Sequence, residues 1–548
     1  MAGGKFGGSQ NILDKRPQPR QHCVRTYVVV NNKSLSAGTE RPVTYLLGID
    51  GGTESLRARL FDLSGRCLGN AVSPYPTEFS PGARAEQDPE HWWQAAGKAV
   101  RAAIAEAGVP ASEVRALSLA TTCCTVVALD AAGRALRPAI LWMDMRAARE
   151  ARDILATGDA ALAVNGAGRG PISAEWMVPK ALWLKRHEPH VFDAAATICE
   201  YQDFMTLRLT GRRTASLNNV SIRWHYATDR GGWPANMVRT LGIEALLEKW
   251  PAEVIAPGDP IGPLTPDAAA HLGLPVSVLV VQGGADALIG VIGLGVSRPG
   301  QIALITGSSH LQFGVTDQPR HVPGLWGTYK DALYAGGYLL EGGQTSTGSI
   351  VNWLRRLVGG NLDLAALNEA AAALAPGAEG LLVIDHFQGN RTPHTDPLAR
   401  GAILGLSLYH GLPHVFRAVI EGICLGTRAI VQRMQEAGLP AAEMVVGGGA
   451  TNSPLWLQIH ADTANLPIRV PDVAEVPSLG AALLAGVGAG CFASIQQGID
   501  AMVSPGRVIE PNPTNAAHYD EIFGRYAAAY AALKPLRAPE GREANSDT

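Results

Sequence analysis

The stretch YLLGIDGGTESLRARLFD, residues 45–62, decides how this 548-residue chain begins to fold. An apolar run ends at Asp50 and meets Gly51 and Gly52, and apolar and polar positions then alternate again. Period-two alternation on both sides of a glycine pair predicts two strands joined as a hairpin. The stretch therefore places a tight glycine turn, with an acidic residue at its mouth, at the end of a buried strand.

Two hydroxyl side chains, Thr53 and Ser55, follow the glycine pair. Backbone N–H groups of a glycine turn can approach phosphate oxygens closely, and short hydroxyls add donors. Asp50 cannot bind phosphate directly because two anions repel, but a carboxylate there can hold Mg²⁺. An ordinary hairpin with Gly-Gly at its tip explains the turn equally well when it is taken alone.

Two later stretches repeat this arrangement, in which an apolar strand ends in glycine and hydroxyl residues. QIALITGSSHLQFGV places Gly307 and Ser308 in such a turn, and MVVGGGATNS places Gly448 and Gly449 in another. This weak internal repeat predicts two related α/β halves that face one another across a cleft. The sequence contains no GxxxxGK[ST] motif, which excludes a P-loop as the simple interpretation.

The stretch QGGADALIG, residues 282–290, ends a predicted strand with two glycines and Asp286. A carboxylate at this position can accept the proton of a substrate hydroxyl during phosphoryl transfer. General-base assistance of this kind contributes roughly 10²–10⁴-fold. An aspartate that caps the following helix fits the same pattern.

Composition limits the possible partners. The chain is 47% hydrophobic with a formal net charge of -3, and no basic block rises above this balance. Nucleic acid and membranes are therefore not expected partners, and no apolar run reaches the roughly 18 residues that cross a bilayer. Seven scattered cysteines without a CxxC pair favour free thiols in a reducing cytoplasm over disulfides or a zinc site.

Length and local composition divide the chain into four segments. At roughly 100–200 residues per domain, the chain is long enough for two or more domains. We expect residues 1–42 to form a disordered polar extension, because they carry basic residues without an apolar signal core; a transit peptide is the alternative. Residues 43–297 and 298–536 are expected to form an N-terminal and a C-terminal domain, and residues 537–548 a disordered tail.

Several longer motifs follow one another along the chain: GIDGGTESLRARLFD, GARAEQDPEHWW, LWMDMRA, GGAD, GAILGLSLYHGLPHVFRAVIEG and GGGATNSPLWLQIHAD. This order resembles that of the FGGY carbohydrate kinases, and the resemblance runs from about Tyr45 to Pro535. It implies an α/β fold of two actin-like domains of the ribonuclease-H type, with ATP and a sugar meeting in the cleft between them. It also implies Mg²⁺ as a cofactor and suggests a homodimer.

The resemblance assigns roles to the residues that match the family's motifs. Asp286 matches the catalytic base, and Asp50 and Asp286 are the implied metal ligands. Ser308 stands where the family usually has threonine, so the hydroxyl is kept. The expected ATP- and phosphate-binding residues are Gly51, Gly52, Thr53, Ser55, Gly307, Ser308, Gly348, Asn352, Gly448, Gly449 and Asn452.

The sugar side departs from two branches of the family. Cys123 and Cys124, in LATTCCTVVALD, stand where glycerol kinases have an adjacent Arg and Glu and xylulokinases a Met-His pair. This stretch, with EGGQTSTG and GNRTPHTDPLARG, looks more like the D-ribulokinase and ribitol-kinase-like branch. The expected sugar-binding residues are Thr122, Cys124, Asp144, Arg146 and Asp286. A structural ion pair between Asp144 and Arg146, and simple packing by the cysteines, are the alternatives.

Two further interpretations concern the helix predicted over residues 88–108 and the residues before it. Trp92 and Trp93 are expected to lie in the core face of this helix rather than to form a sugar platform. Glu86 is expected to cap the N-terminus of the helix rather than to bind a ligand.

The resemblance, together with the chemical fit of these residues, implies an ATP-dependent kinase that phosphorylates a terminal hydroxyl of a ketopentose, with D-ribulose first among the candidates. L-Ribulose, D-xylulose, ribitol and erythritol are alternative substrates for the same chemistry. A sugar-binding regulatory protein without catalysis is the alternative from another class. Sugar-stimulated release of ADP that depends on Asp286 would separate these possibilities.

Overall fold

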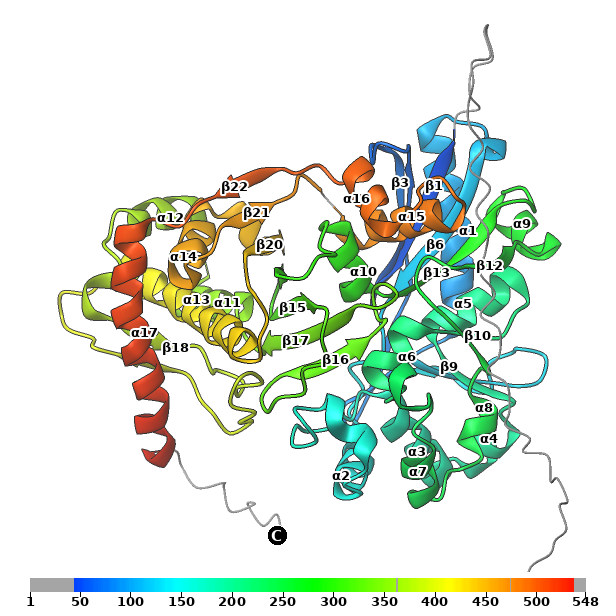
Figure 1. The fold of residues 1–548 in the computed structure, drawn as a ribbon, viewed down its shortest axis with the longest axis horizontal. Coiled ribbons are helices and arrows are strands. Elements are labelled where there is room, and N and C mark those ends of the chain that lie inside the picture. The colour runs from blue at the N-terminus through cyan, green and yellow to red at the C-terminus, as the bar shows by residue number, and fades with distance from the viewer. Residues whose placement is uncertain (1–43, 361–362, 474, 537–548) are drawn as a thin grey trace, which may run out of the picture. The chain divides into compact units, whose positions relative to one another are not determined.

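The computed structural model describes residues 44–360, 363–473 and 475–536. The expected extension at residues 1–42 and the expected tail at residues 537–548 lie outside the described residues. The described chain is a mixed α/β structure with two large sheets, shown in blue to green and in green to orange in Figure 1.

The first large sheet has six strands in the order β12-β13-β6-β1-β2-β3. β1 pairs antiparallel with β2 across the turn at Gly51 and Gly52, which confirms the predicted hairpin. β1 and β13 both pair parallel with β6. The strands are β1 (Tyr45–Gly51), β2 (Ser55–Phe61), β3 (Cys67–Pro74), β6 (Val114–Thr121), β12 (Pro260–Pro263) and β13 (Leu279–Ala285).

The second large sheet has seven strands in the order β16-β17-β15-β14-β20-β21-β22. β14 pairs antiparallel with β15 and parallel with β20, and β20 pairs parallel with β21. The strands are β14 (Gln301–Thr306), β15 (His310–Thr316), β16 (Trp326–Lys330), β17 (Tyr338–Gln344), β20 (Glu443–Gly448), β21 (Ile468–Val470) and β22 (Arg507–Ile509).

The two large sheets follow the same plan. In each, an antiparallel meander of three strands is followed by two parallel strands and an antiparallel edge strand, with β16 added to the second sheet. The β1–β2 turn therefore corresponds to the β14–β15 turn, and the end of β6 corresponds to the end of β20. The relation between two halves that the repeated glycine turns predict is confirmed by this strand order.

Three smaller sheets accompany them. A five-stranded sheet has the order β4-β5-β8-β7-β9, and two pairs are formed by β10 with β11 and by β18 with β19. Their strands are β4 (Glu78–Ser80), β5 (Arg84–Gln87), β7 (Val126–Leu129), β8 (Ala139–Ile140), β9 (Thr197–Glu200), β10 (Thr214–Ser216), β11 (Glu253–Ile255), β18 (Leu382–Ile384) and β19 (Ala402–Leu404).

The helix predicted over residues 88–108 is α1 (Pro89–Ala107), which Gly108 ends in the left-handed region at φ 65°. Trp92 and Trp93 are buried in the core, as expected. The other helices up to the second sheet are α2 (Ala148–Ala156), α3 (Met177–His187), α4 (Pro189–Ala194), α5 (Tyr201–Thr210), α6 (Leu217–Arg223), α7 (Ala235–Thr240), α8 (Leu246–Lys249), α9 (Pro266–Leu272) and α10 (Asp286–Gly293).

The helices that follow the start of the second sheet are α11 (Gly348–Leu357), α12 (Leu364–Ala372), α13 (Leu412–Glu436), α14 (Pro454–Ala464), α15 (Val476–Gly488), α16 (Ile495–Met502) and α17 (Pro513–Leu533). Of these helices, α15 and α16 return to the first half of the chain. α15 packs against β1, β6 and α10, as Figure 1 shows beside the blue strands. The expected division at residues 297 and 298 stays a prediction.

Glycine makes the packing of α15 possible. A Cβ atom on Gly48 of β1 would lie 1.9 Å from the carbonyl oxygen of Ser478, and one on Gly480 would lie 2.1 Å from the carbonyl oxygen of Ile289. Real Cβ atoms do not approach backbone so closely, so these contacts require glycine. The backbones of β1, α10 and α15 are thereby held in direct contact beneath the strand ends that carry Asp50 and Asp286.

Candidate active site

The first sheet brings two acidic residues together at one edge. Because β1, β6 and β13 run parallel, their carboxyl ends meet on the same side of the sheet. Gly51 pairs with Thr121 at the end of β6, and so does Ala285 at the end of β13. Asp50 comes directly before Gly51, and Asp286 comes directly after Ala285. The pairing register therefore places both acids at the same edge of the sheet, on either side of the end of β6.

Asp286 begins helix α10, and its Oδ1 accepts the backbone N–H of Ala287 at 2.6 Å. The side chain keeps part of its surface accessible, yet the surrounding protein removes enough water to raise its pKa to about 7, with a further contribution from the negative charge of Asp50. A carboxylate with a pKa near neutrality is suited to accept a proton at physiological pH.

Asp50 is buried and forms an ion pair with Arg57, whose Nη1 lies 3.0 Å from Asp50 Oδ2. Burial raises the pKa of Asp50 above its ordinary value, and the negative charge of Glu475 adds to this, while Arg57 opposes both. Arg57 therefore pairs with the acid at the mouth of the turn.

The two carboxylates fit a magnesium ion that is held mainly by a nucleotide. Mg²⁺ is usually bound by one or two carboxylates together with phosphate oxygens and waters. Each carboxylate has one oxygen in a protein contact, Asp50 with Arg57 and Asp286 with Ala287. The negative charge of Asp50 raises the pKa of Asp286, and a cation between them would relieve this repulsion. Among the described residues, no group of three or more His, Cys, Asp or Glu side chains could hold a metal by itself.

The hydroxyl groups of two tyrosines contact the glycines of the first turn. A Cβ atom on Gly51 would lie 2.7 Å from the hydroxyl of Tyr201, so only glycine fits there. The Tyr75 hydroxyl donates to the carbonyl oxygen of Gly52. Tyr201 itself stacks on Trp92 of α1 with ring centroids 3.8 Å apart. The predicted core residue Trp92 thus supports the predicted phosphate turn.

The hydroxyl residues of this turn have distinct positions. Thr53 Oγ1 accepts the indole N–H of Trp142 at 3.0 Å, and its carbonyl oxygen accepts from Gln87 at 2.7 Å. A hydroxyl that accepts one bond can still donate its own proton to a phosphate oxygen. Ser55 is buried, and its carbonyl oxygen closes the turn by accepting the N–H of Gly52 at 3.0 Å.

The corresponding turn of the second sheet is exposed and built from backbone. Gly307 and Ser308 are exposed, and their carbonyl oxygens accept the N–H groups of Gly348 and Ser349 at the start of α11. A Cβ atom on Gly348 would lie 2.5 Å from the carbonyl oxygen of Gly307. Gly348 therefore lets α11 approach the turn closely, while its own N–H is used within the protein.

The third glycine turn follows β20, beside the end of β14. Gly448 has φ 92°, and a Cβ atom there would lie 2.0 Å from the carbonyl oxygen of Thr306, whereas one on Gly449 would meet open space. Thr306 Oγ1 donates to Gly447 O and accepts the N–H of Ala450. The structure thus brings the turns at Gly307 and Gly448 together, and leaves Gly449 exposed.

The two predicted asparagines of the nucleotide side, Asn352 and Asn452, are both exposed. Asn352 lies one helical turn after Gly348 on α11, and Asn452 ends the short 3₁₀ helix Gly449–Asn452. Each therefore lies close in sequence to one of the exposed glycine turns. Their contact with a nucleotide stays a prediction.

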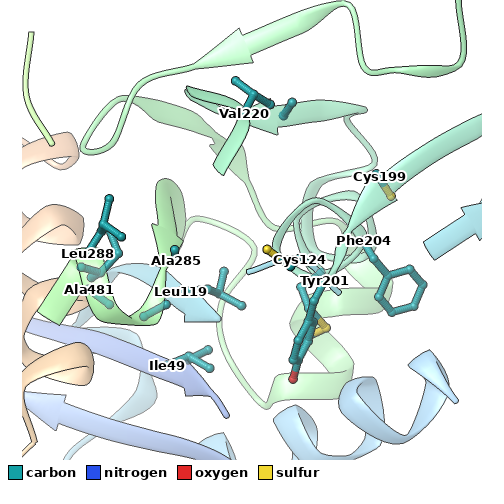
Figure 2. Close-up of a cluster of buried hydrophobic side chains, with 14 of the residues drawn as sticks. Ile49, Leu119, Cys124, Cys199, Tyr201, Phe204, Val220, Ala285, Leu288 and Ala481 are labelled. Atoms are coloured by element: carbon teal, nitrogen blue, oxygen red, sulfur yellow. The ribbon is translucent and has the colours of Figure 1, made fainter. Parts of the chain in front are cut away.

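On the sugar side, Thr122 and Cys124 lie in the loop between β6 and β7. The Thr122 N–H donates to Gly51 O at 3.0 Å, which ties this loop to the first turn. Cys124 is 3% exposed, and Figure 2 shows it among the buried hydrophobic side chains with Tyr201 and Phe204. Its burial favours the packing alternative for Cys124, and a direct contact with sugar stays a prediction.

Asp144 and Arg146 form a buried ion pair. Arg146 Nε and Nη2 each lie 2.8 Å from a different oxygen of Asp144, and the N–H of Ala85 donates to the same carboxylate at 2.7 Å. Arg146 also lies 2.6 Å from Glu86. These contacts agree with the alternative that Asp144 and Arg146 form a structural ion pair. Substrate binding by the pair stays a prediction.

The expected capping role of Glu86 is wrong. Asp88 is the N-cap of α1, since its side chain accepts the N–H of Glu90 at 2.9 Å. Glu86 instead pairs with Arg137 and Arg146. Both acids precede the helix in sequence, but only Asp88 is placed directly before Pro89, where a short carboxylate reaches the first-turn N–H groups.

Two buried charges that sequence reasoning missed shape the sugar-side loop. Lys180 of α3 is fully buried, and its Nζ donates to the carbonyl oxygens of Cys124 and Leu141, both at 2.6 Å. Glu200 is fully buried and accepts the N–H of Cys124 at 2.9 Å and the indole N–H of Trp224 at 2.6 Å. A single charge in an apolar run, as in MVPKALWL, is the signal that could have identified Lys180.

Comparison with known proteins identifies this arrangement. The model of the N-terminal domain of the FGGY family of carbohydrate kinases matches residues 45–293, and the model of its C-terminal domain matches residues 302–489. The chain belongs to the FGGY family of carbohydrate kinases. It is therefore a sugar kinase, and the family uses ATP as the phosphoryl donor.

Proteins similar to this FGGY kinase match it over about nine tenths of its length. The human FGGY carbohydrate kinase domain-containing protein is 30% identical over 89% of this chain and 96% of its own. A ribulokinase from Geobacillus thermodenitrificans is 31% identical over 88% of this chain and 93% of its own. The structure of xylulose kinase from Rhodospirillum rubrum matches with a TM-score of 0.80 and 28% identity, covering 90% of this chain and 99% of that one.

These comparisons establish the fold of the FGGY kinase as two actin-like domains, as the resemblance implied. In the part of the chain that the structure describes, no helix combines the length and the apolar character needed to cross a bilayer.

Proposed function

We propose that this FGGY kinase transfers the γ-phosphoryl group of ATP to a terminal hydroxyl of a ketopentose, with D-ribulose as the preferred substrate. The observation that carries the proposal is Asp286, a carboxylate at a strand end beside Asp50 whose pKa is raised to about 7. The choice of a pentulose is supported by the ribulokinase among its relatives, and by the Cys123–Cys124 pair in place of the glycerol-kinase charges.

In the proposed mechanism, Asp286 accepts the proton of the attacking sugar hydroxyl at its carboxylate. Asp50 and Asp286 would hold Mg²⁺ through oxygens at the mouth of the first turn, and the ion would neutralise phosphate charge. Thr53 donates its hydroxyl proton to a phosphate oxygen, and the glycine turns at Gly307 and Gly448 let the nucleotide approach the backbone. Arg57 opposes the rise that burial causes in the pKa of Asp50, and its ion pair fixes the orientation of that carboxylate.

D-Xylulose is the second candidate substrate. The solved structure from Rhodospirillum rubrum is that of a xylulose kinase. Its 28% sequence identity to this chain is close to the 31% identity of the ribulokinase. Against it stands the absence of a Met-His pair at residues 123–124. The two pentuloses differ in the configuration of one hydroxyl, so one buried polar contact on the sugar side decides between them.

The test is ADP release by the purified protein with Mg²⁺-ATP against D-ribulose, L-ribulose, D-xylulose, ribitol, erythritol and glycerol. We expect D-ribulose to give the highest kcat/KM. A higher kcat/KM with D-xylulose would replace the first candidate by the second. Release of ADP that no sugar stimulates would contradict the pentulose proposal as a whole.

We also propose that the enzyme acts in the cytoplasm as a homodimer. The cysteines of the described residues are free, which is typical of a reducing compartment, and the dimer rests on the family resemblance. Light scattering coupled to gel filtration tests the oligomeric state, and fractionation of the source cells tests the location.

A further inference from the structure

Two adjacent cysteines of the sugar-side loop lie with their sulfur atoms in contact. Cys124 Sγ lies 3.7 Å from Cys123 Sγ. Neighbouring side chains in an extended strand point to opposite faces, so an ordinary backbone would separate the two thiols. Cys124 instead has φ 62°, in the left-handed region that residues other than glycine rarely adopt.

The unusual backbone of Cys124 is held from both sides by buried charges. Glu200 Oε2 accepts its N–H at 2.9 Å, and Lys180 Nζ donates to its carbonyl oxygen at 2.6 Å. Both charged side chains are 0% exposed. Strained backbone of this kind is unfavourable and persists where the surrounding structure fixes it. The pairing of the two sulfurs is therefore built into the fold.

The separation of the sulfurs suits one atom that bonds to both. Two thiolates on a tetrahedral ion with bonds of about 2.3 Å lie about 3.8 Å apart, so the 3.7 Å between the sulfurs of Cys123 and Cys124 is within reach of a single bridging atom. The smaller bond angle at pyramidal arsenic requires the sulfurs to approach each other slightly further. Cys123 is partly exposed, so a reagent can enter from its side, while Cys124 is buried. No third metal-binding side chain completes a metal cage among the described residues.

The protonation state of the Cys124 thiol determines which reactions are favoured at this site. Burial raises the pKa of its thiol well above the ordinary value, and hydrogen bonding to Cys123 adds to this. Reactions that need a thiolate, such as alkylation and disulfide exchange, are therefore disfavoured at Cys124. A trivalent arsenical reacts with two neutral thiols, because the As=O bond and both S–H bonds break and the oxygen leaves as water with the two thiol protons.

We propose that Cys123 and Cys124 form a dithiol site that captures monosubstituted trivalent arsenicals and that occupancy of this site inhibits the kinase. In the step, R–As=O and two S–H groups give a cyclic R–As(S)₂ product and one water, with two As–S bonds formed and no change of oxidation state. The product lies on the loop between β6 and β7. Thr122 of this loop donates to Gly51 O, next to Asp50, and the preceding Thr121 pairs with Ala285, next to Asp286. The inhibitory part rests on the proposed active site, and capture itself does not.

The test uses the full-length protein and phenylarsine oxide as the probe. Intact-mass measurement after incubation with one equivalent should show one phenylarsine group gained and two hydrogens lost, and peptide mapping should place it on the peptide that contains residues 123–124. ADP release should fall in proportion to the adduct. 2,3-Dimercaptopropanol should remove the adduct and restore activity, whereas an equal amount of a monothiol should restore little.

Matched variants separate this site from the other thiols. Cys123→Ser and Cys124→Ser should each abolish the stable adduct, while Cys67→Ser, which removes the exposed thiol of β3, should leave it unchanged. Absence of an adduct on the folded wild-type protein, or an equal adduct on both loop variants, would overturn the site. A complete adduct with undiminished ADP release would overturn the inhibitory part. Mapping on the wild-type protein decides the site even where a variant fails to fold.

Discussion

The two large sheets share one strand order, yet their equivalent ends carry different chemistry. At the first sheet, the glycine turn and the neighbouring strand end carry Asp50 and Asp286, and burial raises the pKa of both carboxyls. At the second sheet, the turn equivalent to that of Asp50 carries Gly307, and the end of β20, which is equivalent to the end of β6, carries Gly448; there backbone meets backbone closely. We therefore propose that one copy of the fold supplies charged groups for chemistry, and that the other supplies a surface that a nucleotide can approach.

The difference also extends to how each edge is supported. Behind the first edge, buried charges and rings fix the loops: Lys180 holds two carbonyl oxygens, and Tyr201 lies against Gly51. At the second edge the turns are exposed, and hydrogen bonds between backbone groups hold them together with hydroxyls such as that of Thr306. Substitutions at the first edge should therefore affect catalysis and stability strongly, and those at the second edge should affect mainly the affinity for ATP.

The largest effect is expected from Asp286→Asn. The amide keeps the shape but cannot accept the proton, so kcat should fall by roughly 10²–10⁴-fold. The folded protein should be no less stable, because a carboxyl whose pKa burial raises is replaced by a neutral group. Steady-state ADP release and thermal unfolding measure both quantities. Activity within a few-fold of wild type would make Asp286 a helix cap rather than the base.

Asp144→Asn should reduce the free energy of unfolding by about 1.5–3 kcal/mol, because it removes charged hydrogen bonds from the buried Arg146, which keeps Glu86 as its other partner. Urea unfolding measures this change. Asp130→Asn is the matched control, since its pair with Arg134 is exposed and should contribute little to stability. Unchanged stability with a raised KM for sugar would instead support the substrate role predicted for Asp144.

Lys180→Met should raise the KM for sugar by roughly 10–100-fold, in line with losing charged hydrogen bonds of about 1.5–3 kcal/mol, and leave the KM for ATP nearly unchanged. The physical reason is that Lys180 holds the loops at Cys124 and Leu141 together. Lys185→Met on the same helix is the control, because its ammonium is paired at the surface with Asp193. Equal changes in both KM values would indicate a general loss of structure.

The pH dependence should follow Asp286. Because its carboxylate must be ionised to act and its pKa is raised to about 7, kcat/KM should fall below pH 7, by about tenfold per pH unit. Stability has the opposite sign: with a folded pKa above the ordinary 3.8, the contribution of this group is lost as pH rises from 3.8 to about 7. The unfolding temperature of wild type relative to Asp286→Asn should decrease across that range. A profile flat from pH 5 to 8 would contradict the assignment.

The smallest effect concerns a pair of neighbouring glycines. Gly449→Ala places its methyl in open space, so stability should change by less than about 0.5 kcal/mol, while the KM for ATP rises a few-fold if the nucleotide approaches there. Gly448→Ala meets the carbonyl oxygen of Thr306 and a positive φ, and should lower stability as well. Isothermal titration measures the affinity of each variant for ATP, and thermal unfolding measures its stability. An unchanged KM in Gly449→Ala would remove this turn from the nucleotide site.

Local patterns in the sequence predicted the local structure well. Alternation around Gly51 and Gly52 predicted the β1–β2 hairpin, and Gly108 marked the end of α1. Asp286 was correctly expected directly after a strand. These features depend on a few adjacent residues, whose periodicity and turn chemistry are visible in the chain itself.

Features that depend on distant segments could not be predicted. The parallel register that joins Asp50 to Asp286 and the return of α15 to the first sheet involve residues more than 200 positions apart. Glu86 was misassigned because a cap and an ion-pair partner look alike in sequence. Lys180 was missed because lysine is almost never fully buried unless paired, so composition argues against its actual position.

The measurement that tests the central claim most directly is identification of the product formed from D-ribulose and Mg²⁺-ATP. Phosphorus and carbon NMR of the reaction mixture would show whether a phosphomonoester forms at a terminal carbon. The account predicts one equivalent of pentulose phosphate per ADP with the wild-type enzyme, and almost none with Asp286→Asn. ADP without sugar phosphate, or the same yield of product from Asp286→Asn, would contradict it.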